Sequence, residues 1–285
     1  MSANKSMNQV VRNYVAAQDS NLMNEVQKQI ISDTIKCRFG GFALELVDMF
    51  CKPAIFSGMS FEERLCRCLE RQQKVMETSR FERMYRESKL PGKIYMNTIR
   101  PEPERGITQE LLLKLINAGY LDVTATNGCT NIIFSGNSGV GKTTLAVATA
   151  TEALLKGFSV MYFSMNELAA MLELKDKIDF IKFRDKLENI NLLICDDYGQ
   201  EMLSDPVIIR LKEIADKRYG KGSTIFTTHL KQDALGTVSR ESPVLSAMLN
   251  RLFRPSDMYV TITGESWRGS PNELNRAKDN SNGQN

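Results

Sequence analysis

The chain has 285 residues, of which 42% are hydrophobic and 25% are charged, and its formal net charge is +3. These values are ordinary for a globular protein, with enough chain for one large domain or for a medium and a small one. They exclude a uniformly basic nucleic-acid binder, so any DNA contact has to come from a local patch. No apolar run approaches the roughly 20 residues that cross a bilayer. The polar N-terminus lacks the apolar core of a signal peptide, which predicts a cytoplasmic protein without membrane contact.

The first third of the chain predicts helices. Residues 1–30 are polar, and we expect a loosely ordered extension or a helical arm there. A small all-α domain is predicted for residues 31–99, with room for contacts to DNA, to a partner protein or to other subunits. Within it, Ser60 and Glu63 have the spacing of a capping box, which predicts the start of a long helix. The helix is expected to end at the stretch "KLPGK", Lys89–Lys93, because proline and glycine disfavour its continuation.

The long helix carries two separate stripes at helical spacing. The apolar stripe is expected to pack against the rest of the helical domain. Its members are Phe61, Leu65, Cys68, Leu69, Val75 and Met76. The basic stripe consists of Arg64, Arg67, Arg71 and Lys74. A stripe of charges is usually a solvated helix face, and the alternative is a line of contacts to DNA phosphates.

The character of the sequence changes after "RPEPERG", Arg100–Gly106, which has the composition of a linker. A helix over "ITQELLLKLINAGYL" is followed by short apolar strands that alternate with helices. The strands are predicted at Asn131–Ser135, Ser159–Met165, Asn191–Cys195, Thr224–Thr228 and Met258–Thr263. The helices between them are predicted at Lys142–Lys156, Glu167–Leu174, Pro206–Arg218 and Val244–Phe253. The alternation predicts a parallel sheet covered by helices on both faces in a domain of residues 100–268, followed by a disordered tail, residues 269–285.

A phosphate-binding loop stands between the first strand and its helix. The stretch "GNSGVGKT", residues 136–143, matches the pattern G-x-x-x-x-G-K-[ST]. Its glycines permit a tight loop whose N–H groups point at phosphate oxygens, and the helix N-terminus adds a positive dipole end. We expect Lys142 to reach the β- and γ-phosphates of ATP and Thr143 to bind Mg²⁺. The predicted nucleotide contacts are Gly136, Asn137, Ser138, Gly139, Val140, Gly141, Lys142, Thr143 and Thr144.

Adjacent acids follow the third predicted strand. Four apolar residues lead directly into Asp196 and Asp197, although burying a carboxylate costs several kcal/mol unless it is paired. Mg²⁺ would supply the missing charge, so we predict that Asp196 holds the metal. Asp197 is then expected to activate or orient the water that attacks the γ-phosphate. The next strand ends in Thr227, Thr228 and His229, and one of these is expected to point toward the γ-phosphate. His229 is the predicted sensor, with Thr228 as the alternative.

The order of these motifs resembles the IstB/DnaC branch of the AAA+ ATPases. The resemblance is carried by "GNSGVGKTTLA", "LLICDDYG", "GSTIFTTHL", "MLNRLFR" and "GESWRG". The helical sequence from Ser60 to Pro91 is similar to the N-terminal helices of IstB proteins in particular. The resemblance implies an AAA+ P-loop αβα sandwich with a five-stranded parallel sheet, preceded by a smaller all-α domain. It also implies an ATPase that oligomerises on double-stranded DNA, largely independently of base sequence, and that assists an insertion-sequence transposase.

The resemblance adds roles for residues that local patterns do not single out. The phosphate loop falls in the Walker A motif and the paired aspartates fall in the Walker B motif. Arg251 falls at the arginine-finger position, which reaches the nucleotide of the next subunit in a homo-oligomer. Arg268 resembles the second-sensor arginine, and Arg254 fits either role. His229 stands where relatives often carry Asn or Gln, which is a departure from the pattern of the family.

Other functions remain open at the level of sequence. The same ATPase domain would serve a DnaC-like loader of the replicative helicase, and the N-terminal helices favour the IstB reading over that one. A small-molecule kinase of the P-loop type would need an acceptor pocket and lid arginines near the loop. The segments "MLNRLFR" and "GESWRG", which flank the last predicted strand, argue against such a kinase.

Overall fold

The computed structural model describes residues 9–11, 13–16, 22–125, 128–232, 234–235 and 253–266. The chain divides into two compact units, residues 1–83 and 84–285, and the division falls inside the long helix α5 (Phe61–Ser88). The helix predicted at Val244–Phe253 lies outside the described residues except for its last residue. None of the helices described is both long and apolar enough to span a membrane.

The first unit is built from helices, as the sequence predicts. Its helices are α2 (Glu25–Lys36), α3 (Gly40–Cys51), α4 (Pro53–Phe56) and the first part of α5. The capping box of α5 is present, since the Ser60 N–H donates to Glu63 Oε2 at 2.7 Å and the Glu63 N–H donates to Ser60 Oγ at 3.2 Å. The "KLPGK" prediction is confirmed as well, because α5 ends at Ser88 and Lys89 adopts a positive φ of 59°.

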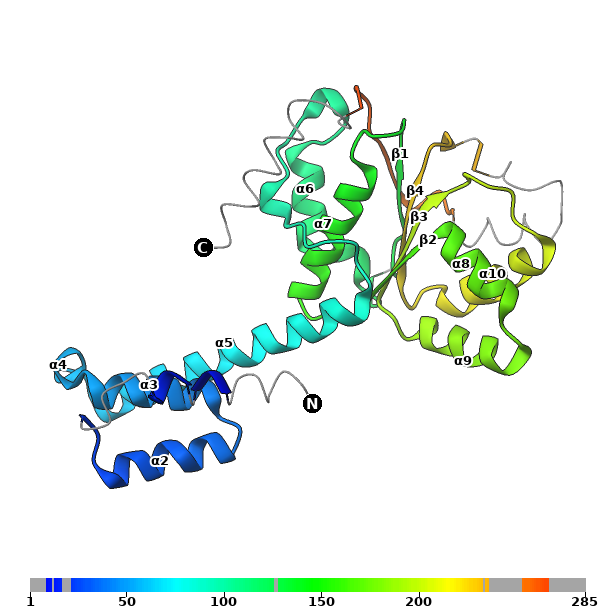
Figure 1. Ribbon diagram of the computed structural model, residues 1–285. Coiled ribbons are helices and arrows are strands. Elements are labelled where there is room, and N and C mark those ends of the chain that lie inside the picture. The colour runs from blue at the N-terminus through cyan, green and yellow to red at the C-terminus, as the bar shows by residue number, and fades with distance from the viewer. Residues whose placement is uncertain are drawn as a thin grey trace. The chain divides into compact units, whose positions relative to one another are not determined.

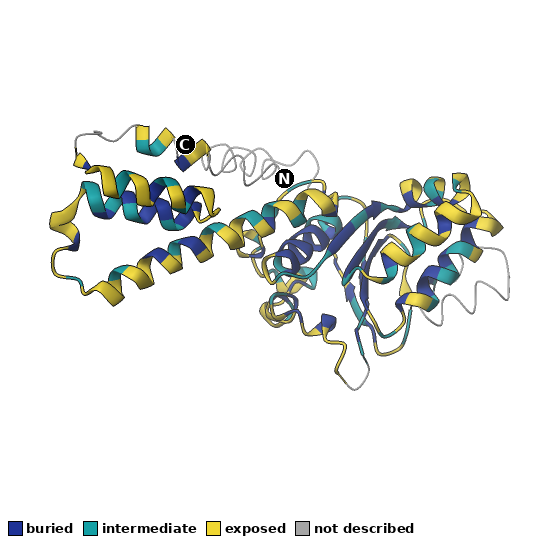
Figure 2. Cartoon of the chain, turned by 90° about the horizontal axis from the view of Figure 1, so that it is seen from below, coloured by how far each residue is buried: buried dark blue, intermediate teal, exposed yellow. Residues whose placement is uncertain are grey.

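The buried face of α5 differs from the predicted apolar stripe. Cys68 is buried as predicted, yet the neighbouring buried position is Gln72, whose Oε1 accepts hydrogen bonds from the N–H groups of Gly41 and Phe42. A Cβ atom at Gly41 would collide with the α5 backbone, so this glycine lets α3 approach closely and fixes the rotation of α5. Figure 2 shows the solvent side of α5 in yellow. The exposed fraction is 74% for Phe61, 53% for Leu69 and 60% for Met76.

The second unit contains a parallel sheet with the strand order β2-β3-β4-β1-β5 in the described residues. The strands are β1 (Ile132–Ser135), β2 (Val160–Ser164), β3 (Leu192–Tyr198), β4 (Ser223–Thr228) and β5 (Met258–Thr261). In Figure 1, α7 (Lys142–Leu155) covers one face, with α6 (Gln109–Asn117) against it. The other face carries α8 (Met165–Leu174), α9 (Lys177–Glu188) and α10 (Asp205–Arg218). This αβα sandwich confirms the predicted fold class.

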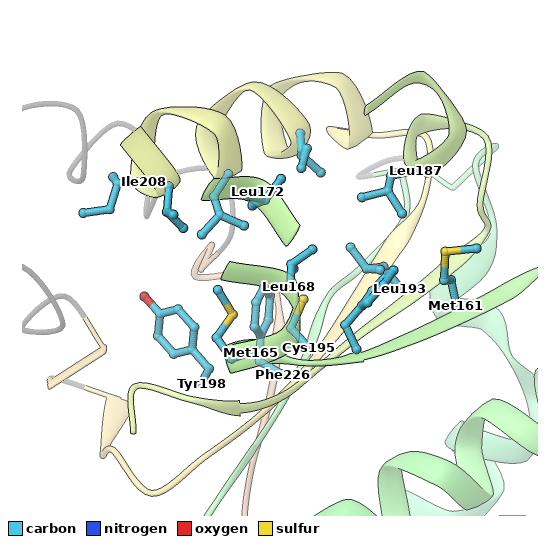
Figure 3. Packing of buried hydrophobic residues seen from close by; sticks show 14 of the residues in the cluster. Met161, Met165, Leu168, Leu172, Leu187, Leu193, Cys195, Tyr198, Ile208 and Phe226 are labelled. Atoms are coloured by element: carbon cyan, nitrogen blue, oxygen red, sulfur yellow. The ribbon is translucent and has the colours of Figure 1, made fainter. Parts of the chain in front are cut away.

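The core between the sheet and α8–α10 explains why the strands read as continuous apolar runs. Strand side chains such as Met161, Leu193 and Phe226 face Leu168 and Leu172 of α8 (Figure 3). Because helices cover both faces of the sheet, neither side of a strand needs polar residues. All strands run in the same direction, so their carboxyl ends meet along one edge, where ligands bind in open α/β sheets.

The segment predicted as a linker, Arg100–Gly106, forms a defined turn that hydrogen-bonds to the phosphate loop and to the residues after β5. It contains a 3₁₀ turn, Pro103–Arg105, closed by backbone hydrogen bonds between Glu102 and Ile107. The guanidinium of Arg105 donates to the carbonyl of Val140 at 2.8 Å and to that of Thr263 at 3.0 Å. Its ion pair with Glu102, at 2.8 Å, keeps the side chain in place. Short connections (η2, Met96–Thr98; η4, Gly119–Leu121) complete the described elements.

Candidate functional site

The loop between β1 and α7 has a shape that requires its glycines. Gly136, Gly139 and Gly141 have φ values of 148°, 79° and 98°, a region that other residues rarely adopt. A Cβ atom at Gly136 would collide with the carbonyl oxygen of Ile262, and one at Gly139 would collide with the side chain of Ser266. The segment that follows β5 therefore lies against the loop. Asn137 and Ser138 are exposed at the loop's tip, and Thr144 follows in the first turn of α7.

The Lys142 ammonium lies inside the curve of this loop. The residue is 5% exposed at the start of α7, and its Nζ donates to the carbonyls of Gly136 at 2.9 Å and Asn137 at 2.8 Å. The same Nζ is 3.3 Å from Nδ1 of His229, which follows β4. The fold thus brings together a loop lysine and a histidine that are 87 positions apart in the sequence.

The buried carboxylate of Asp196 is satisfied by hydroxyl groups. Asp196 is 4% exposed on β3. Its carboxylate accepts hydrogen bonds from Thr143 Oγ1 at 3.0 and 3.1 Å, from the Tyr162 hydroxyl at 2.7 Å and from Thr227 Oγ1. Burial raises the pKa of Tyr162 and the hydrogen bond to Asp196 raises it further, so this hydroxyl keeps its proton. No basic side chain in the described part of the chain forms an ion pair with Asp196.

Asp197 occupies an irregular position at the end of β3. Its φ is 61°, in the left-handed region, and the pairing register between β3 and β4 shifts between Cys195 and Tyr198. The Asp197 N–H donates to Thr227 Oγ1 at 2.8 Å. Its side chain is 41% exposed, with Oδ1 at 3.9 Å from Nε2 of His229. The bulge therefore turns the second acid out of the sheet and toward the histidine, while the first acid stays buried.

The alternatives for the γ-phosphate sensor have different surroundings. Thr228 is fully buried, and its hydroxyl donates to the Tyr198 carbonyl at 2.7 Å and accepts from the Leu230 N–H at 3.1 Å. His229 is partly exposed and contacts Lys142, and its Nε2 lies 3.2 Å from Nε2 of Gln200. The polar group that faces the loop lysine is therefore the imidazole of His229.

The predicted arginine roles meet different outcomes. Arg251 and Arg268 lie outside the described residues. Arg254 donates to the Cys129 carbonyl at 2.6 Å and pairs with Asp257 at 3.1 Å. These partners precede β1 and β5, so Arg254 lies at the sheet edge opposite the phosphate loop. A second-sensor arginine would have to face the loop of its own subunit, which makes that interpretation of Arg254 wrong.

The basic stripe of α5 is largely engaged inside the helical unit. Arg64 donates to the carbonyl of Phe56 at 2.7 Å. Arg67 and Arg71 donate to the carboxylate of Glu45 at 2.9 and 2.8 Å, and Arg71 also contacts Asp48 at 2.7 Å. Lys74, the remaining member, is exposed. Arg67 and Arg71 thus hold α5 against α3 and Arg64 holds it against α4, and DNA contact by the stripe stays a prediction.

Sequence reasoning missed several residues of the site. The hydroxyl of Tyr162 comes from the middle of β2, and no pattern in the sequence indicates its contact with Asp196. Thr227 is one of the polar residues that end the predicted strand, but no local pattern indicates its contact with both aspartates. Arg105 lies in a segment with linker composition, so its contact with Val140 of the loop is not predictable from local sequence.

Comparison with known proteins gives a family match over most of the chain. Residues 46–274 match the model of the IstB-like ATP binding proteins. A Sinorhizobium fredii protein named as an insertion sequence ATP-binding protein is 33% identical over 166 residues, 58% of this chain and 65% of that protein. A Pseudomonas fluorescens protein named as an ATP-binding protein of insertion sequence IS1162 is 28% identical over 215 residues, 75% of this chain and 90% of its own length.

Solved structures give a likeness of fold. The crystal structure of a DNA replication initiation factor aligns with a TM-score of 0.50 and 21% sequence identity. The alignment covers 67% of this chain and 55% of that one. At this level of identity the likeness shows the fold alone.

Proposed function

The chain belongs to the family of IstB-like ATP-binding proteins, with an AAA+ sandwich as its second unit, and from this premise we propose that it hydrolyses ATP in a Mg²⁺-dependent reaction. The observation that carries the proposal is the direct contact between the Thr143 hydroxyl and the Asp196 carboxylate, 3.0 Å apart, beside the loop that holds Lys142. In P-loop proteins, Mg²⁺ is bound by a hydroxyl group of the loop and by an aspartate, together with phosphate oxygens of the nucleotide.

The donor set of Asp196 fits a magnesium ion. The groups that donate to it are neutral hydroxyls, so no cationic side chain among the described residues competes with a metal ion for this carboxylate. Thr143 and Asp196 would hold Mg²⁺, which neutralises charge on the phosphate oxygens when it is bound. The N–H groups of the loop and the start of α7 would bind the same oxygens, because a helix N-terminus favours anions.

The remaining side chains of the site have separate roles in hydrolysis. Lys142 exchanges its contacts with the loop carbonyls for the β- and γ-phosphates. Asp197, at the open side of the bulge, orients the attacking water and accepts its proton. His229 lies between Lys142 and Asp197, which suits a group that responds to the γ-phosphate. Phosphate release from ATP, assayed with and without Mg²⁺, tests the proposal, and release that does not depend on Mg²⁺ would contradict it.

We further propose that subunits assemble so that Arg251 completes the site of a neighbour. An arginine that reaches the γ-phosphate from the next subunit stabilises the charge that develops during transfer, and such residues contribute orders of magnitude in rate. The test mixes Arg251→Ala with Lys142→Ala in the presence of DNA and ATP. Mixed assemblies should recover hydrolysis that neither variant shows alone. If sizing shows co-assembly without recovery, the role of Arg251 across subunits is excluded.

We assign Arg268 to the second sensor of its own subunit.

Double-stranded DNA and a transposase are the partners that we propose. The support is that the relatives are named for insertion sequences, so a protein of this kind serves DNA transposition. With a net charge of only +3, DNA binding would rest on local phosphate contacts, independent of base sequence and tighter with ATP than with ADP. Binding of the purified protein to the neighbouring transposase, compared with the replicative helicase, separates this proposal from a helicase loader. Capture of the helicase alone would favour the loader.

Lys74 offers the cleanest test of the basic stripe, because the arginines of the stripe are also needed for packing. If Lys74 contacts a phosphate, Lys74→Ala reduces the slope of log Kobs against log salt by about 1. Lys156→Ala, at the C-cap of α7 in the second unit, is the matched control for the loss of an exposed lysine. An unchanged slope for Lys74→Ala would assign the stripe to packing alone.

A further inference from the structure

A single hydroxyl group links the paired aspartates of β3. Thr227 lies on β4 and is fully buried. Its Oγ1 contacts the carboxylate Oδ1 of Asp196 and, at 2.8 Å, the backbone nitrogen of Asp197. By contrast, the Thr143 and Tyr162 hydroxyls contact Asp196 alone among these acids. Thr227 is therefore placed to act on both acids together.

The direction of these hydrogen bonds follows from their chemistry. A backbone N–H can only donate, so the Thr227 oxygen accepts from Asp197. The single hydroxyl hydrogen is then left for the Asp196 carboxylate, which is an acceptor. The side chain thus forms a chain of bonds from the backbone of one acid to the side chain of the other. Bonds of this kind within a buried site strengthen one another.

The position of Thr227 in the sheet explains why this link is needed. Cys195 pairs with Phe226 and Tyr198 pairs with Thr228, so Asp196 and Asp197 stand opposite Thr227 alone. Such a bulge leaves part of the strand without its ladder bonds and bends it. Asp197 is held there at a φ of 61°, a conformation that costs free energy unless its surroundings stabilise it. The hydrogen bond from its N–H to Thr227 supplies that stabilisation.

We infer that Thr227 is a positioning residue that sets the Walker B acids relative to each other. It orients the carboxylate of Asp196 toward Thr143 and holds the backbone of Asp197 in the conformation that turns its side chain toward His229. This inference rests on the proposed function, because it assigns Thr227 to the same ATP site. Thr227 does not contact the reacting atoms, and it acts through the two aspartates.

The test compares Thr227→Val, which keeps the shape and removes the hydroxyl, with Thr227→Ser, which keeps the hydroxyl. Groups that orient metal ligands typically contribute 10- to 100-fold in affinity or activity. We expect Thr227→Val to lower kcat for ATP hydrolysis by about 10- to 100-fold, with KM changed by less than about threefold. The Mg²⁺ concentration that half-saturates binding of a fluorescent ATP analogue should rise in the same variant by about tenfold. Thr227→Ser should restore most of both quantities.

The matched control is Thr151→Val in α7. Thr151 is fully buried, and its hydroxyl donates to the Val147 carbonyl at 2.9 Å, away from the aspartates. This variant also loses a buried hydroxyl, and it should leave kcat and the Mg²⁺ dependence within about twofold of wild type. Equal losses in Thr227→Val and Thr151→Val, with equal shifts in melting temperature, would reduce Thr227 to a structural residue. A kcat for Thr227→Val within twofold of wild type would overturn the inference.

The outcomes distinguish this inference from the function on which it rests. If the wild type shows no Mg²⁺-dependent ATP hydrolysis, the proposed function itself fails. If the wild type is active and Thr227→Val matches it in kcat and Mg²⁺ dependence, only the role of Thr227 fails. The binding readout is independent of turnover, so it reports the orientation of Asp196 even where hydrolysis is slow.

Discussion

Buried carboxylates in the two units of this protein are satisfied by different partners. Glu45 on α3 is 6% exposed, and the guanidinium groups of Arg67 and Arg71 donate to it. Asp196 on β3 is 4% exposed, and hydroxyl groups donate to it. A buried charge is stable only when an opposite charge or sufficient hydrogen bonds accompany it. Arginine side chains thus neutralise Glu45, whereas the hydrogen bonds to Asp196 come from neutral hydroxyls that orient it without neutralising it. Under the proposed function a cation supplies the charge missing at Asp196, so that Glu45 is a structural carboxylate and Asp196 is a metal ligand.

The largest expected effect is the loss of the loop cation. Lys142→Ala should reduce ATP hydrolysis by more than about 100-fold, because a fixed positive charge at the phosphates is removed. Phosphate release at saturating Mg²⁺ measures it. Lys156→Ala, at the C-cap of α7, removes a lysine from the opposite end of the helix and should retain full activity. Hydrolysis by Lys142→Ala within twofold of wild type would remove the basis for an ATP site here.

The next effect concerns the second aspartate. Asp197→Asn should lower kcat by about 100-fold or more, because the group that activates the water is lost. ATP binding should stay within about threefold of wild type, because Asp196, the proposed metal ligand, is unchanged. Asparagine tolerates the left-handed conformation at a φ of 61° nearly as well as aspartate, so the backbone need not move. Single-turnover hydrolysis and nucleotide binding separate the two quantities. Loss of Mg·ATP binding with normal turnover of bound ATP would mean that the roles of the two acids are reversed.

Replacing Glu45 should lower the stability of the helical unit. Glu45→Gln leaves the two arginines without their shared counter-charge, and Arg67 remains about half exposed. We expect the free energy of unfolding to fall by about 2–3 kcal/mol, between the ranges for exposed and buried ion pairs. Urea unfolding followed by circular dichroism measures this change. Glu70→Gln, an exposed change on α5, should cost less than about 0.5 kcal/mol. Equal stabilities of the two variants would show that the ion pairs around Glu45 contribute nothing.

Acid should weaken the same helical unit through Asp48. Burial alone would raise the pKa of this carboxyl, but hydrogen bonds from Arg71, Lys52 and Tyr14 outweigh it and hold the pKa at about 2. Since the pKa in the folded state is below the usual 3.8, the stabilisation is complete above about pH 5 and is lost as pH falls toward 2. The expected loss is about 2 kcal/mol, measured by urea unfolding at several pH values. Asp48→Asn should lack this pH-dependent part. An identical pH dependence in both proteins would contradict the assignment.

The parts of the fold that the sequence predicts are those with strong local patterns. The strands of a covered parallel sheet are continuous apolar runs, and the phosphate loop requires glycine at fixed positions. Helix α9 was missed because only Phe180 and Leu187 of its 12 residues are buried, so its apolar face is narrow.

The parts that the sequence does not predict depend on contacts between distant segments. The rotation of α5 is set by Gly41 and Gln72, and the spacing of apolar residues along α5 contains no information about α3. The bulge in β3 brings Asp197 to Thr227, yet the adjacent acids do not indicate a bulge and nothing local indicates the contact with Thr227. Arg105 attaches the proline-containing segment to the phosphate loop through its hydrogen bond to the Val140 carbonyl. In each case, a hydrogen-bond partner more than 25 positions away decides the local structure.

The most direct test of the difference between the two carboxylates is a calorimetric titration of ATP into the protein, with and without Mg²⁺. It compares wild type with Asp196→Asn and Glu45→Gln at a temperature where all three proteins are folded. We predict that Mg²⁺ tightens ATP binding to the wild type and to Glu45→Gln by about tenfold or more, and that Asp196→Asn loses this gain. If Mg²⁺ tightens binding to Asp196→Asn as much as to the wild type, the assignment of Asp196 to the ligand site is contradicted.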